Sequence, residues 1–233
     1  AASLKVKESF LAVKIVRQVK NVALLGVPTS AASLAAGHER APAALRAAGL
    51  AERLTAAGFA VTDYGDSTTR GFEPDEEHPR ARCVGRVLAM IEEFRPKMEV
   101  AVKSGALPII LGGDNSIVLS AIAGMRRYFR NVSLVYLDGD AGLNIPNTTP
   151  SGCVDGMVIS HVIGRGAPEL VRFWRDPPLV REPDVALFGV ERLDAPEEEY
   201  LTRSPLRRYM AKDVRRMGAV AAAELALDRV HGR

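Results

Sequence analysis

The sequence has little of what would place it in a specialised class of protein. Its only cysteines are Cys83 and Cys153, which excludes a disulfide framework and indicates a reducing compartment. No apolar run reaches the roughly 18 residues that a membrane-spanning helix needs, so no membrane span is expected. The 31 basic and 28 acidic residues leave a net charge of only +3, which argues against a nucleic-acid partner. What remains is an ordinary globular chain of 233 residues, 47% of them apolar.

The N-terminal segment differs from the rest in charge. Residues 1–20 contain five basic side chains and a single acid, Glu8, with apolar residues between them. This pattern is typical of a solvated leading helix, of a basic amphipathic helix, or of the end left after an organelle transit peptide is removed. We therefore expect a basic extension over 1–20 and one domain over 21–233, located in the cytoplasm or the mitochondrial matrix.

Apolar strand patterns alternate with helical patterns along the rest of the chain. Strands are predicted in NVALLGVP (21–28), FAVTDYGD (59–66), ALPIILGGDNS (106–116), VSLVYLDGD (132–140) and DVALFGV (184–190). Helices are predicted over 41–50, 80–103 with a kink or break at Pro96, 116–128 and 214–230. The alternation predicts an α/β fold with a parallel sheet that helices cover on both faces.

Acidic side chains follow two of the predicted strands. The carboxyl ends of parallel strands are where functional groups gather in such folds. Asp138 and Asp140 lie at i and i+2, so in extended backbone both carboxylates point to the same side. With the amide oxygen of Asn115 they would suit Mg²⁺ or Mn²⁺. The alternative is that the pair stabilises a turn, because Asp and Gly are common turn residues.

Several motifs occur in the order found in the ureohydrolase superfamily. PIILGGDNS (108–116) is similar to the Gly-Gly-Asp-His-Ser signature of that family, and LLGVPTSAASLAAGHERAPAALRAAGL (24–50) resembles its first strand, loop and helix. YLDGDAGLNIPNTTPSGCVDGM (136–157) resembles the Asp-Ala-His-Ala-Asp strand end and the Ser-Gly-Asn-x-His-Gly loop. The chain resembles arginase more than agmatinase. The resemblance implies a three-layer α/β/α fold with a mostly parallel sheet, and two Mn²⁺ ions that activate water to release urea from a guanidinium group.

This chain departs from the family pattern at the positions that hold the metal. Asn115 replaces the histidine of the first motif, and Asp140 replaces the histidine of the second. Asp138 is retained, whereas Gly142 stands where the second aspartate would be. The histidine associated with proton transfer falls on Asp155. We therefore expect vestigial metal positions at Asp138, Asp140 and Asn115, with no cofactor bound.

The loop that follows is closer to the family pattern. Asn144, Thr149 and Ser151 match the positions with which arginases recognise the α-amino-acid end of the substrate, and Cys153 replaces an asparagine of that set. One interpretation is a residual amino-acid pocket. The other is that the polar loop is kept for its turn geometry.

The resemblance also implies that part of the sheet is missing. The family has a second pair of metal-binding aspartates and further C-terminal strands beyond the helix that ends in LALDRVHGR (225–233), and those strands lie inside the sheet. Interior gaps leave backbone groups unpaired. We therefore expect the domain to be incomplete at its C-terminus, with either more of the polypeptide or another chain filling the gap.

Three functions are compatible with this pattern. The leading hypothesis is a catalytically inactive, arginase-like structural or regulatory subunit of an oligomer or larger assembly. The second is a metal-dependent ureohydrolase with Mn²⁺ or Mg²⁺ in a reduced or partner-completed site. The third is an amino-acid sensor built on Asn144, Thr149 and Ser151.

Overall fold

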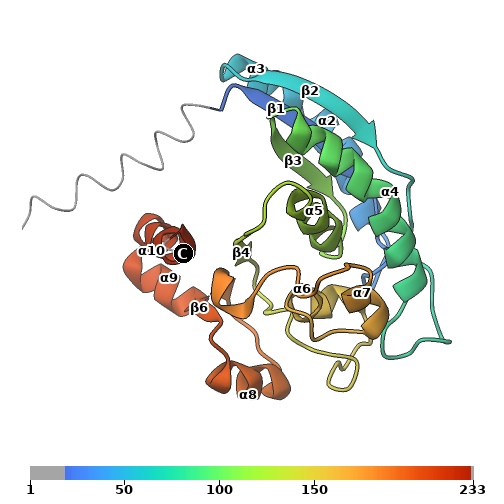
Figure 1. The fold of residues 1–233 in the computed structure, drawn as a ribbon, viewed down its shortest axis with the longest axis vertical. Coiled ribbons are helices and arrows are strands. Elements are labelled where there is room, and N and C mark those ends of the chain that lie inside the picture. Colours follow the sequence, from blue (N-terminus) through green and yellow to red (C-terminus); the bar gives the residue numbers. More distant parts are fainter. Residues whose placement is uncertain (1–18, 232–233) are drawn as a thin grey trace, which may run out of the picture.

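The computed structural model describes residues 19–231 (Figure 1). The expected basic extension at 1–20 therefore lies almost wholly outside the described residues. Within them, no helix has both the length and the apolar character required to traverse a bilayer.

Six strands form the framework, and they divide into two parallel sheets of three. One sheet has the order β2-β1-β3 and the other β4-β5-β6. β3 and β4 are each the last strand of their sheet, so in the described part of the chain no ladder joins the two halves. The strands are β1 (Asn21–Val27), β2 (Ala60–Asp66), β3 (Leu107–Gly112), β4 (Leu134–Leu137), β5 (Val185–Val190) and β6 (Arg207–Met210).

The centre of the first sheet is β1, and its sequence explains why. Residues 22–27 are buried without alternation, as expected for a strand with helices on both of its faces. α4 (Val84–Lys103) contacts β1 and β3, while α2 (Ala41–Ala47) contacts β3 and α3 (Leu50–Ala56) contacts β2. Figure 1 shows α4 in front of this sheet and α2 and α3 behind it.

The helices of the first half follow the predicted pattern with two differences. Gly49 ends the first predicted helix in a left-handed conformation, but α3 begins at the next residue. α4 runs through Pro96 to Lys103 without a break, and its apolar side, which includes Phe94 and Met98, is buried in the core. α5 (Ile117–Arg126) packs against α4.

The second half contains elements that the sequence pattern did not predict. These are β6, α6 (Val158–Val162), α7 (Pro168–Arg172) and α8 (Ala195–Arg203), with short 3-10 turns at Val154–Met157 and Glu182–Asp184. In the first half, a 3-10 turn at His38–Arg40 precedes α2. The helix predicted over 214–230 is two helices, α9 (Ala211–Met217) and α10 (Ala219–His231). Gly218 separates them because its positive φ of 84° ends the first helix.

Candidate functional site

The turn after β3 is a tightly packed, buried structure. Gly113 lies so close to the end of β1 and the loop after it that a Cβ would come within 2.5 Å of the Thr29 carbonyl oxygen. The next residue, Asp114, is 3% exposed, and its carboxylate accepts hydrogen bonds from the backbone N–H groups of Ala32 and Ser116, each at 3.0 Å. The hydroxyls of Thr29 and Ser116 also donate to it. Asp114 therefore ties the loop after β1 to the turn after β3.

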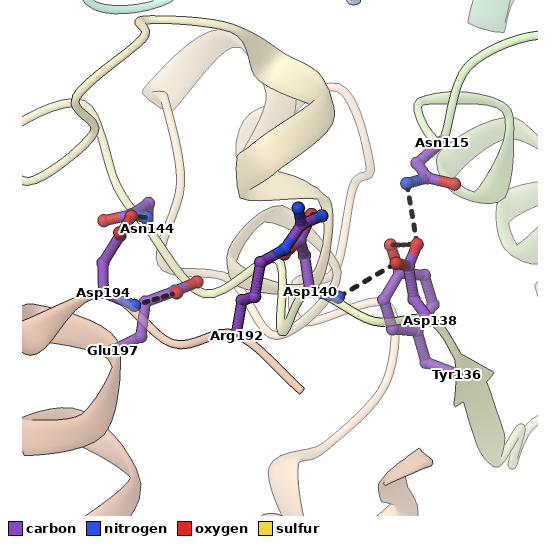
Figure 2. Close-up of polar contacts among 8 residues, drawn as sticks. All are labelled: Asn115, Tyr136, Asp138, Asp140, Asn144, Arg192, Asp194 and Glu197. Carbon is purple, nitrogen blue, oxygen red and sulfur yellow. Dashed lines mark hydrogen bonds and ion pairs between the residues drawn. The ribbon is translucent and has the colours of Figure 1, made fainter. Parts of the chain in front are cut away.

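Asp138, the first residue after β4, is held by neutral donors (Figure 2). Its Oδ2 accepts hydrogen bonds from Asn115 Nδ2 at 3.1 Å and from the Tyr136 hydroxyl at 3.0 Å. Its Oδ1 accepts a bond from the backbone N–H of Asp140 at 3.0 Å. Burial and the neighbouring Asp138 charge raise the pKa of Tyr136, so the phenol keeps its proton and remains a donor.

Asp140 has a different partner from Asp138. Arg192 binds it in bidentate fashion, with Nε to Oδ1 and Nη2 to Oδ2 both at 2.9 Å. Figure 2 shows the Asp140 carboxylate at the guanidinium of Arg192 and the Asp138 carboxylate toward Asn115. The reason is that β4 ends at Leu137, so the alternation of a strand does not govern the two aspartates.

Two further sequence-predicted positions lie beside this cluster. Gly142, where a carboxylate was expected to be lost, has a φ of +62°, and its carbonyl oxygen accepts hydrogen bonds from the N–H groups of Ile159 and Ser160 in α6. Asp155 accepts a bond from the Asn115 N–H at 2.7 Å. Burial, together with the charges of Asp114 and Asp138, raises the pKa of Asp155 to about 6.

The loop predicted to recognise an amino acid forms hydrogen bonds within itself and to the start of α8. Asn144 donates to Asp194 at 2.7 Å and accepts from the Thr148 hydroxyl at 2.9 Å, so both ends of its amide are engaged. Thr149 Oγ1 accepts from the Gly152 N–H, and Ser151 Oγ accepts from the backbone N–H that follows at Cys153. The contacts within the loop are those expected of a turn.

Sequence reasoning missed the acidic pair that opens α8. Asp194 and Glu197 form a capping box, in which each side chain caps the backbone N–H of the other. Glu197 is 5% exposed and also accepts a hydrogen bond from the Leu143 N–H at 2.8 Å. Burial raises the pKa of Glu197. The spacing Asp-x-x-Glu with Pro196 in the first turn was the signal for this helix start.

The structure thus joins Asn115, Asp138 and Asp155 into one hydrogen-bonded group. Asp140 pairs with Arg192 instead, and the loop residues Asn144, Thr149 and Ser151 bond within their own segment or to α8. Across residues 19–231, no set of three or more His, Cys, Asp or Glu side chains is arranged to hold a metal ion.

Comparison with known proteins shows the family to which the chain belongs. The arginase family model matches residues 20–233. The chain belongs to the arginase family. Arginase of Bacillus subtilis (strain 168) is 29% identical over 211 residues, which are 90% of this chain and 70% of that protein. Mitochondrial arginase-2 of Mus musculus is 27% identical over 94% of this chain and 63% of its own length.

Solved structures agree with this assignment. The crystal structure of arginase from Bacillus cereus superposes with a TM-score of 0.84 at 28% identity, covering 91% of this chain and 72% of that one. Native arginase from Bacillus caldovelox gives a TM-score of 0.84 at 26% identity, covering 92% of this chain and 73% of that one. The expected α/β/α fold with a mostly parallel sheet is confirmed.

Proposed function

We propose that this chain is a catalytically inactive member of the arginase family that serves as a structural or regulatory subunit of an oligomer or larger assembly. The observation that carries the proposal is the set of partners at the strand-end positions. Asp138 is engaged by three neutral donors, and both oxygens of Asp140 are engaged by Arg192. These side chains are satisfied by the protein itself.

The donor set does not fit two Mn²⁺ ions. Manganese in such a site is held by carboxylates and imidazoles. Here the residue in place of the first imidazole is Asn115, whose amide N–H is turned toward Asp138. Gly142 brings no side chain, and its positive φ disfavours one. Without the ions, water at neutral pH is a weak nucleophile toward a guanidinium carbon.

The polar loop supports the same conclusion for the substrate. Both ends of the Asn144 amide are already bonded, and the hydroxyls of Thr149 and Ser151 accept backbone N–H groups of the turn. A ligand that drew these groups away from their present partners would break bonds that shape the loop. We therefore interpret the match at these three positions as conservation of the turn and not as an amino-acid pocket.

The strand edges that are open among residues 19–231 are compatible with a role in an assembly. β3 and β4 each end a sheet, and Leu107 on β3 and Leu137 on β4 are 47% and 75% exposed. A terminal parallel strand presents unpaired N–H and C=O groups, which favour pairing with another strand. We propose that further strands, from more of this polypeptide or from a partner chain, bond to β3 and β4 and so join the two half-sheets.

Urea release from arginine tests the proposal. We expect no urea from the purified chain loaded with Mn²⁺, nor from the native complex isolated from its source cells, under conditions in which Bacillus subtilis arginase is active. Mn²⁺-dependent urea release that is lost on Asp138→Ala would overturn the proposal and favour the ureohydrolase alternative. A rise in melting temperature with millimolar arginine or ornithine would instead favour the sensor alternative.

A further inference from the structure

The pair between Asp140 and Arg192 stands on a rigid backbone junction. The N–H groups of Glu191 and Arg192 both donate to the Gly139 carbonyl oxygen, at 2.8 and 3.0 Å. Asp140 and Arg192 also face each other as an isolated parallel bridge, just beyond the paired strands β4 and β5. Both side chains therefore start from fixed positions, which lowers the entropy cost of the bidentate contact.

The two aspartates at this junction differ in whether a cation lies beside them. Asp140 has a cation within ion-pairing distance, whereas Asp138 has none within residues 19–231. The hydrogen bonds to Asp140 raise the pKa of Arg192, and the charge of Asp138 adds to this effect. The guanidinium thus lies in the field of both carboxylates, which is where a divalent cation would otherwise be attracted.

We propose that Arg192 is an internal counter-cation that occupies Asp140 and thereby keeps the end of β4 closed to divalent metal ions. This inference rests on the proposed function and extends it, because it names the group that blocks the metal position. The planar fork of arginine matches the two carboxylate oxygens, so each oxygen of Asp140 already accepts one N–H while the pair is formed, and a metal ion must compete with the guanidinium. Removing the guanidinium would leave both carboxylates without an ion-pair partner among residues 19–231.

Mn²⁺ titration followed by electron paramagnetic resonance of the free ion tests the inference. The wild-type chain is compared with Arg192→Ala, with Arg192→Ala/Asp140→Asn, and with Arg215→Ala. Arg215 is the matched control because it is similarly exposed and pairs with Glu191, next to Arg192, at 3.1 Å. We expect Arg192→Ala to bind Mn²⁺ about fivefold more tightly than the wild type, the scale of an exposed ion pair. The double variant and Arg215→Ala should remain at the wild-type level.

The outcomes separate this inference from the proposed function. Equal Mn²⁺ binding by the wild type and Arg192→Ala, or a gain that persists in the double variant, overturns the counter-cation role and leaves the absence of urea release untouched. A gain of equal size in Arg215→Ala also overturns it, because that would be a general effect of net charge. Urea release by the Mn²⁺-loaded wild type would contradict the proposed function instead.

Discussion

Asp114 and Asp140 both lie just beyond the end of a strand, β3 and β4 respectively, but they differ in burial and in hydrogen-bond partners. Asp114 is 3% exposed and accepts hydrogen bonds from two backbone N–H groups of two different loops. The side chain of Asp140 is 54% exposed, and among residues 19–231 its carboxylate accepts side-chain hydrogen bonds from Arg192 alone. A buried acid that satisfies backbone donors is hard to replace without loss of stability, whereas an exposed one is free to vary.

This difference explains which family residues this chain has retained. Asp114 and the two glycines before it keep the shape of the turn, and Gly113 has backbone atoms within 3 Å of where a Cβ would lie. At Asn115, Asp140 and Gly142, no buried backbone contact of this kind requires the residue type that the family motif has. The match of a motif residue is therefore evidence of the fold when the residue is buried and bonded to backbone, and evidence of chemistry only when its ligand atoms are free.

The largest effect is expected from Asp114→Ala. The change leaves the N–H groups of Ala32 and Ser116 buried without partners, which should lower the free energy of unfolding by about 4 kcal/mol. Urea denaturation followed by circular dichroism measures this loss. Asp140→Ala is the matched control and should leave the denaturation midpoint almost unchanged. Equal losses in the two variants would contradict the distinction between the buried and the exposed acid.

The sequence predicted the framework well, because buried parallel strands leave a strong pattern. The run at 21–28 and the one at 184–190 are both strands at the centre of their sheets. The split at Gly218 and the helix α3 were missed because a single glycine both ends one helix and allows the next to begin.

The hydrogen-bond partners of the site residues could not be predicted from the sequence. Asn115 and Asp138 are 23 residues apart and Asp140 and Arg192 are 52 apart, so only the fold decides that they meet. Capping by Asp194 and Glu197 was readable in the sequence, but the burial of Glu197 against the Leu143 N–H was not. The spacing of nearby residues predicts turns and helix caps, whereas contacts between residues far apart in the sequence depend on the fold.

The same contrast between buried and exposed side chains applies to the histidines, and it predicts the second-largest effect. His161 is 1% exposed, with Nδ1 at 2.7 Å from the Met157 carbonyl oxygen and Nε2 accepting the Ala167 N–H, a pattern that requires the neutral ring. Burial lowers the pKa of His161 to about 4, from 6.5 in the unfolded chain. The folded state therefore binds fewer protons between these pH values. Its stability falls by about 3 kcal/mol as the pH drops from 6.5 to 4, and no more below that.

Asp155 must be separated from this effect, because its contribution has the opposite sign. Its raised pKa of about 6 means that the folded state takes up a proton first, which stabilises it as the pH falls from 6 toward 3.8. The measurement is therefore the difference in unfolding free energy between the wild type and His161→Gln as a function of pH. His78→Gln is the control, since His78 is exposed. A difference that does not change between pH 7 and pH 4 would contradict the buried, neutral state of His161.

The smallest of the three effects on stability is expected at Gly142. Gly142→Asp introduces the carboxylate that the resemblance implies for this position, but a Cβ there would lie 3.2 Å from Val158 Cγ1, and the φ of +62° strains any L side chain. We expect a loss of about 2 kcal/mol in unfolding free energy. Gly139→Asp is the matched control, because nothing lies within 4 Å of its Cβ and its φ is ordinary. If Gly142→Asp is as stable as Gly139→Asp, the backbone at residue 142 accommodates a side chain without strain. That result would contradict the predicted loss of stability.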